Sequence, residues 1–114
     1  MYAVDEFLIE HDLAPEDLDV VRMDVEGYEA EILEGMAELL NSDSSLVMFI
    51  ELHRRLRDEG TLSWTVETLR EAGFECSLAV YEPRLRDPRY LDGFDDLLEI
   101  DWGEKENIEL VLTR

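Results

Sequence analysis

Hydrophobic and polar positions change their spacing several times along the chain, and each change predicts a helix or a strand. Residues 20–25 and 46–52 are short, almost continuous apolar runs, which is typical of strands buried on both faces of a parallel sheet. Residues 74–81 and 108–113 alternate apolar and polar side chains, which favours antiparallel strands with one exposed face. The apolar side of the first of these alternating strands is expected to hold Phe74, Cys76, Leu78 and Val80.

Helical spacing, with apolar residues three and four positions apart, appears in other parts of the chain. Residues 2–11 and 28–40 both show it, and the second segment is the clearest helix of the sequence. A third helix is predicted over residues 64–72 with Ser63 as its N-cap, and a short one around residues 90–98. Helices therefore alternate with strands at first and an antiparallel finish follows, which is an α/β pattern.

Composition adds one unusual feature, a large excess of acids. The chain has 114 residues, which suits one small domain, and its hydrophobic content of 46% is ordinary for a globular protein. It has 30 Asp and Glu against 10 Lys and Arg, for a net charge of −20. Such an excess disfavours binding to nucleic acid or to an anionic membrane and indicates a salt-loving organism. In the helix over residues 28–40, four glutamates are expected to cover the polar face: Glu29, Glu31, Glu34 and Glu38.

The cysteine content and the apolar runs give the expected compartment. Cys76 is the single cysteine, so no intrachain disulfide forms, and its place in an alternating run favours a small core side chain. We expect no signal peptide and no membrane span, because the longest apolar run, residues 46–50, is too short to cross a bilayer. A cytoplasmic protein is therefore expected.

Polar residues gather where the two parallel strands are predicted to end. Asp24, Glu26 and Gly27 follow the first strand, and Glu51 and His53 close the second. Ligands of open α/β sheets bind beyond the carboxyl ends of parallel strands, so we expect these residues to converge on one rim. A carboxylate or an imidazole there can accept a proton, and Gly27 lets the backbone bend or approach a ligand closely.

The residues alone leave a purely structural interpretation open. Glu26 would then complement the dipole of the following helix, Asp24 would be a cap, and His53 would begin an exposed polar stretch. Three carboxylates and one imidazole also suit a hard divalent cation, but no tightly spaced ligand motif supports one. We therefore predict no metal site.

The same region resembles the FkbM-type methyltransferases. The resemblance rests on Val4-Asp5, on R-x-D-V-E-G-x-E over residues 22–29, and on E-L-H over residues 51–53. It is specific over residues 3–53, and after Gly73 it rests on the order of elements and on the ending ENIELVLTR. The resemblance implies a Rossmann-like class I fold and the use of S-adenosylmethionine, with a small-molecule or sugar hydroxyl group as the methyl acceptor.

The resemblance also implies that only part of this fold is present. The family fold begins with a strand and a glycine-rich turn that hold the cofactor, and the six glycines of this chain contain no G-x-G-x-x-G motif. Residues 1–114 are therefore expected to be one partial domain that begins just before the fourth strand of a sheet ordered 3-2-1-4-5-7-6. Strands 4-5-7-6 would remain, with the fourth strand as an open edge.

Two functions follow from the resemblance. In the first, the chain belongs to an O-methyltransferase that is incomplete without an N-terminal half and inactive alone. Asp24, Glu26 or His53 would accept the proton of the acceptor, and the substrate would be bound by Arg22, Gly27 and Glu51, whereas cofactor-binding residues stay unassigned. In the second, the chain is a non-catalytic remnant that acts as a partner subunit or binding module, and it self-associates through the open strand edge.

Overall fold

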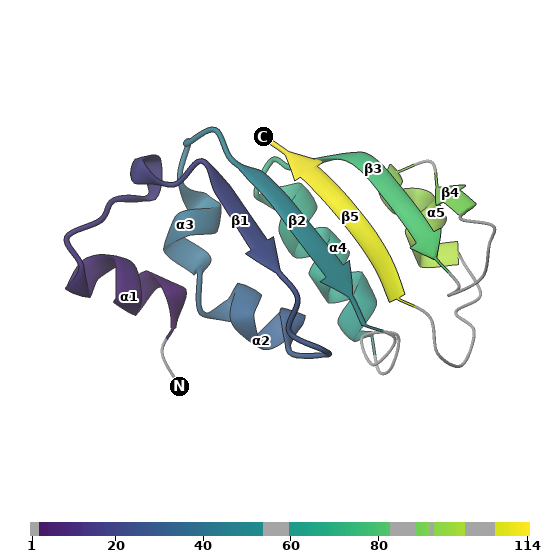
Figure 1. Ribbon diagram of the computed structural model, residues 1–114, viewed down its shortest axis with the longest axis horizontal. Helices are drawn as coiled ribbons and strands as arrows, with labels where there is room; N and C mark the ends of the chain where they lie inside the picture. The colour runs from purple at the N-terminus through teal and green to yellow at the C-terminus, as the bar shows by residue number, and fades with distance from the viewer. Residues whose placement is uncertain (1–2, 54–59, 83–88, 92, 100–106) are drawn as a thin grey trace.

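The computed structural model describes residues 3–53, 60–82, 89–91, 93–99 and 107–114 (Figure 1). The helical elements are α1 (Val4–Glu10), the 3₁₀ turn η1 (Pro15–Asp17), α2 (Glu29–Glu34), α3 (Ala37–Asn41), α4 (Thr61–Glu71) and α5 (Gly93–Glu99). The strands are β1 (Val20–Met23), β2 (Val47–Leu52), β3 (Glu75–Glu82), β4 (Arg89–Leu91) and β5 (Asn107–Thr113). None of these helices is long and apolar enough to cross a membrane.

The five strands form one mixed sheet in the order β1-β2-β5-β3-β4. β1 and β2 are adjacent and parallel, with Val20 opposite Val47 and Met23 opposite Ile50, as the apolar runs predicted. β5 lies between β2 and β3 and is antiparallel to both, which confirms the antiparallel pair. The order β1-β2-β5-β3 is the 4-5-7-6 order of the C-terminal half of a class I methyltransferase sheet, with the short β4 added at the β3 edge.

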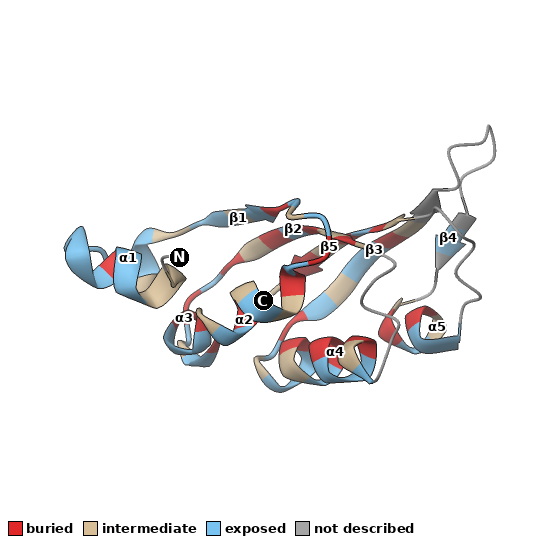
Figure 2. Ribbon diagram, turned by 90° about the horizontal axis from the view of Figure 1, so that it is seen from below, coloured by how far each residue is buried: buried red, intermediate tan, exposed pale blue. Residues whose placement is uncertain are grey.

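Of the described helices, α2 to α5 cover one face of this sheet. Figure 2 shows α2, α3, α4 and α5 on the same side of the strands, and no described helix covers the opposite side. Side chains that face the helices form the core and are at most 3% exposed; they include Met23, Met48, Ile50, Leu52, Ala79, Ile108, Leu110 and Leu112. The expectation that β1 and β2 are buried on both faces is wrong, because Val20 is 55% exposed and Phe49 is 43% exposed.

The single helix predicted over residues 28–40 is two short helices, α2 and α3, because α1 packs against the break between them. The backbone N–H of Asp5 donates to the carbonyl of Gly35 at 3.0 Å. The Asp5 carboxylate then accepts hydrogen bonds from the backbone N–H groups of Glu38 and Leu39, at 2.8 and 3.2 Å. Asp5 therefore caps α3 from another helix, an interaction that the spacing of apolar residues does not reveal.

The starts of two helices and the alternation of one strand also differ from the prediction. α4 begins at Thr61, directly after Gly60 in the left-handed region (φ +77°), so Ser63 lies inside the helix and is not its cap. Residues 90 and 91 belong to β4, and the short helix starts later, at Gly93. In β3, a shift in pairing register between Cys76 and Leu78 reverses the alternation, so Leu78 is 43% exposed while Ala79 is buried.

The last residue of the chain closes one end of the helical layer. The Arg114 guanidinium donates to the carbonyls of Leu40 at 2.6 Å and Ala72 at 3.0 Å, near the C-terminal ends of α3 and α4. Its Nε donates to the carbonyl of Ser44, and its Cζ lies 4.7 Å from the ring centre of Phe74. Burial lowers the pKa of Arg114, and the negative charge of Asp43 opposes that change. Arg114 thus satisfies helix-end carbonyls that have no partner within their own helices.

Candidate functional site

The turn that follows β1 has a strained backbone. After Met23 the chain passes through residues 24–27 and enters α2, and two successive residues of this turn have positive φ, Glu26 at 53° and Gly27 at 106°. A residue with a side chain costs about 1–2 kcal/mol in this region of conformational space. Strain of this kind, held in place by the surrounding fold, is frequent at functional sites. The turn leaves Glu26 exposed and buries Gly27.

A buried carboxylate holds this turn from inside. Glu29 is fully buried, and its Oε1 accepts a hydrogen bond from the backbone N–H of Gly27 at 3.1 Å. Its Oε2 is buried and has no hydrogen-bond partner among the residues that the structure describes. The prediction that Glu29 covers the solvent face of its helix is therefore wrong, because the left-handed turn points an amide inward and Glu29 supplies the acceptor. A buried oxygen without a partner is rare and is typical of a site with a function or stored strain.

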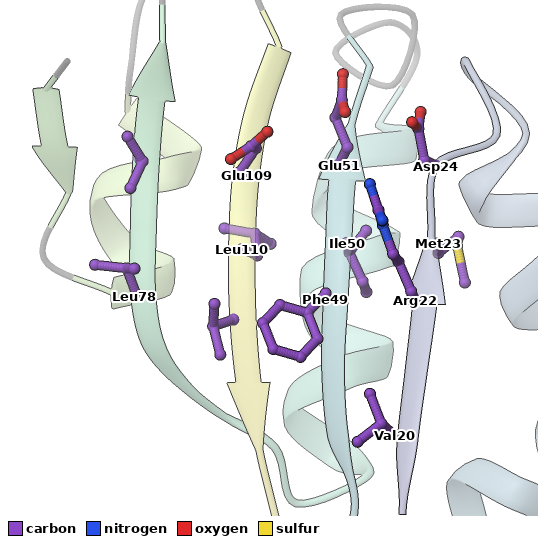
Figure 3. Close-up of a pocket in the computed structure, with 12 residues that line it drawn as sticks. Val20, Arg22, Met23, Asp24, Phe49, Ile50, Glu51, Leu78, Glu109 and Leu110 are labelled. Atoms are coloured by element: carbon purple, nitrogen blue, oxygen red, sulfur yellow. The ribbon is translucent and has the colours of Figure 1, made fainter.

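Three of the predicted site residues line one hollow on the open side of the sheet. The hollow has a volume of about 460 Å³, and Arg22, Asp24 and Glu51 lie along it together with Phe49 and further residues of β3 and β5. Figure 3 shows Arg22 between Asp24 and Glu51, with both carboxylates at the end of the hollow where β1 and β2 finish. The structure therefore places β1 and β2 side by side and brings the polar residues at their ends, Asp24 and Glu51, to one hollow. The sequence predicted this arrangement.

Glu109 belongs to the same hollow and was not predicted. It is exposed on β5 directly opposite Glu51 in the pairing register, and both carboxylates line the hollow. Glu51 is half-buried and accepts a hydrogen bond from Nδ2 of Asn107. Alternation in the last strand indicated which residues share the face of Glu109. The register that sets Glu109 opposite Glu51 follows only from the three-dimensional fold.

The remaining predicted residues lie at the same edge of the sheet but do not line the hollow. Glu26 and Gly27 form the turn beyond β1, and His53 is half-buried directly after the last residue of β2. Because β1 and β2 are neighbours, these residues follow adjacent carboxyl ends. The rim, defined as Asp24, Glu26, Gly27, Glu51 and His53, can therefore bind a polar group and accept a proton. The roles of these residues stay predictions.

Potential metal ligands are not clustered in the described part of the chain, and the single cysteine is half-buried. Within residues 3–53, 60–82, 89–91, 93–99 and 107–114, no three His, Cys, Asp or Glu side chains are grouped to hold a metal ion. Cys76 is half-buried and free. Burial raises the pKa of its thiol, and the hydrogen bond to the Leu78 carbonyl, 3.6 Å from Sγ, opposes that rise. A protonated thiol is a poor nucleophile.

Known proteins are similar to this chain in sequence or in structure. A family model described as "Methyltransferase FkbM domain" matches residues 1–76. Among solved structures, the "crystal structure of M1.HpyAVI-SAM complex" is similar, with 19% sequence identity and a TM-score of 0.44. That similarity covers 99% of this chain and 54% of the other, so this chain spans about half the length of that structure. No curated protein is a match.

Proposed function

Because this chain belongs to the FkbM methyltransferase family, whose model matches residues 1–76, we propose that it forms the acceptor-facing part of an S-adenosylmethionine-dependent methyltransferase. The acceptor is a hydroxyl group of a small molecule or a sugar. The observation that carries the proposal is the turn over residues 24–27, which lies inside the family match at the carboxyl end of β1 and keeps Glu26 in a strained conformation.

The described residues do not fit the cofactor on their own. Gly27 follows β1 and leads into α2, and its N–H already donates to Glu29 at 3.1 Å. A ligand would need that amide free in order to use it. The other described glycines with positive φ, Gly60, Gly73 and Gly93, stand singly beside helix ends. The methyl donor is therefore held by another polypeptide segment, and we derive no step through it.

Residues of the rim would act on the acceptor. Loss of the hydroxyl proton makes the oxygen a better nucleophile, and Asp24, Glu26 and His53 are the candidates to accept that proton. Arg22 and Glu51 would hold the acceptor from the hollow, and Gly27 would contribute by shaping the turn beside it, because its N–H is already used by Glu29. Holding two reactants in the correct orientation is itself a large part of the rate enhancement of such transfers.

A second candidate function is a non-catalytic binding module. The uncovered face of the sheet, with Phe49 and Leu78 each 43% exposed, favours it. In this alternative the rim has no chemical role, and the chain acts as a subunit that binds another protein. The two functions make different predictions for a mixture with the glycine-rich half of a family member.

The experiment combines this chain with a separate chain that holds the glycine-rich half of an FkbM methyltransferase. Transfer of a labelled methyl group to a panel of sugars and small hydroxyl compounds is measured, and S-adenosylmethionine is titrated by calorimetry into each chain and into the mixture. We expect no stoichiometric binding to this chain alone, and binding with methyl transfer in the mixture. A tight complex with this chain alone would contradict the cofactor assignment. Stable association of the halves without transfer would favour the binding module.

A further inference from the structure

The uncovered side of the sheet carries a contiguous apolar patch. We define the open face by its apolar residues Val20, Phe49, Leu78, Val80 and Val111 and by its acidic end Asp24, Glu51 and Glu109, all of which line the hollow (Figure 3). The pairing register places Phe49 opposite Val111, and Val111 opposite Leu78, so the three side chains form a row across β2, β5 and β3.

Such a row is unusual on the surface of a monomer. Val20 is 55% exposed, and Phe49 and Leu78 are each 43% exposed. Sheets built from parallel strands with helical crossovers are normally covered by helices on both faces. Here α2 to α5 occupy one face only (Figure 2). Apolar patches of this kind mark binding surfaces, and the architecture indicates that the missing cover is helical.

The charges at one end of the open face indicate which charged residues the covering helix carries. Glu51 and Glu109 are directly opposite each other on β2 and β5, and like charges in that position repel. Asp24 lies at the same end of the hollow and Arg22 stands between Asp24 and Glu51, so three carboxylates and one guanidinium border one end of the apolar row and leave it acidic. Lysine or arginine side chains at one end of the covering helix would relieve this repulsion. A second copy of this chain, with its net charge of −20, is a poorer partner.

We propose that the open face binds an amphipathic helix of a separate polypeptide. Its apolar stripe covers Phe49, Val111 and Leu78, and basic residues in one terminal turn contact Glu51 and Glu109. In this mode of recognition, an amphipathic helix places its apolar face, which is formed by residues three and four positions apart, against an apolar surface. This proposal deepens the second candidate function, the binding module, because a helix over Phe49 and Glu51 fills the hollow in which Arg22 and Glu51 would hold the acceptor. Its test measures binding without methyl transfer, so the two proposals fail independently.

The test uses the full chain and two labelled synthetic helices of 18 residues. Both helices carry the same leucine stripe, and the last turn of one holds three lysines where the other holds three glutamates. Binding is measured by fluorescence anisotropy at about 0.15 M salt, where the Debye length is about 8 Å. The lysine helix is expected to bind at least about tenfold more tightly than the glutamate helix.

Variants of the chain locate the binding surface. Phe49→Ser and, separately, Leu78→Ser are expected to weaken binding of the lysine helix about tenfold or more, because each removes apolar area that the helix buries. Glu109→Lys is expected to weaken binding of the lysine helix and to strengthen binding of the glutamate helix. The matched controls are Ile9→Ser, which replaces a 67% exposed side chain on α1, and Glu67→Lys on the exposed side of α4. Circular dichroism verifies that each variant is folded.

Three results would overturn the proposal. The first is no binding of either helix to the folded chain. The second is equal loss of binding in Ile9→Ser and in both open-face serine variants. The third is sedimentation of the chain as a dimer that Phe49→Ser converts to a monomer, because the open face would then be occupied by a second copy.

Discussion

The two faces of the sheet differ sharply in exposure although the same strands build both. On the covered face, Ile50 and Leu110 are at most 2% exposed, whereas on the open face Phe49, the neighbour of Ile50 in sequence, is 43% exposed. Side chains alternate between faces along a strand, so each strand contributes to both surfaces. The difference shows that the described helices pack against one side of the sheet, and the other side is the surface for which we propose a partner helix.

The ends of the sheet differ as well. At one end, Arg114 joins the C-terminal ends of α3 and α4 through several carbonyl groups and stacks on Phe74. At the other end, the rim follows the carboxyl ends of β1 and β2, and its turn stores strain at Glu26. At the closed end, Arg114 donates to helix-end carbonyls, whereas near the rim one oxygen of Glu29 has no partner among the described residues.

The largest expected difference in stability is between alanine variants of two leucines, one on each face of the sheet. Leu110 on the covered face is 1% exposed, and Leu78 on the open face is 43% exposed on the neighbouring strand. We expect Leu110→Ala to lower the free energy of unfolding by about 2–5 kcal/mol, the usual loss for a buried leucine. Leu78→Ala is expected to cost about 1 kcal/mol or less. Urea denaturation of both variants measures this, and equal losses would contradict the one-sided core.

Replacement of Arg114 tests the closed end. Arg114→Ala removes charge-assisted hydrogen bonds to carbonyls of α3 and to Ala72, and we expect it to cost about 2–3 kcal/mol in the free energy of unfolding. Arg114→Lys keeps the charge but loses the planar donor group, so it is expected to recover less than half of the loss. Denaturation curves of both variants supply the measurement. Full stability of the lysine variant would mean that charge alone is needed.

Salt acts on the charged surface and not on the core. Because the net charge is −20, self-repulsion falls as salt rises, and we expect the melting temperature to increase by about 5 °C or more from dilute buffer to molar salt. For a domain near this size, that corresponds to about 1 kcal/mol. The loss caused by Leu110→Ala is expected to be the same at both salt concentrations. A melting temperature that is independent of salt would contradict the interpretation of the charge.

The smallest expected stability effect concerns the strained turn. Glu26 and Asp12 both have positive φ, 53° and 54°, and both are exposed, but Asp12 lies far from the rim at the end of α1. Glycine at either position removes the steric penalty, so Glu26→Gly and Asp12→Gly are each expected to change stability by about 1 kcal/mol or less, in the stabilising direction. Thermal melting measures both. Marked destabilisation by Glu26→Gly alone would show that the Glu26 side chain holds the turn.

The sequence predicted the strands and their neighbours because these depend on local patterns. Continuous and alternating runs identified β1, β2, β3 and β5, and the rule for ligands at strand ends brought Asp24 and Glu51 together. These inferences need only the period of the pattern and the order of elements.

The sequence did not predict features that depend on contacts between distant segments. The break between α2 and α3 follows from capping by Asp5, and the exposure of Leu78 follows from a register shift within β3. Glu29 has the spacing of a solvent-facing residue, but the left-handed backbone at Gly27 turns an amide toward it. The apolar runs in β1 and β2 indicated two buried faces. Such a pattern indicates that both faces are to be covered, but it does not indicate which segment covers them.

The most direct test of the account compares rate with stability for the rim in the two-chain enzyme. Asp24→Asn, Glu26→Gln and His53→Ala are each combined with the glycine-rich half, and methyl transfer and the melting curve are measured on the same samples. If a rim residue accepts the proton, its variant is expected to lose about 10²–10⁴ in rate, while its melting curve stays almost unchanged. A charge that only complements a helix end contributes about 0.3–1 kcal/mol to stability and nothing to the rate. Full methyl transfer by all three variants, with or without a shift in melting temperature, would contradict a catalytic rim.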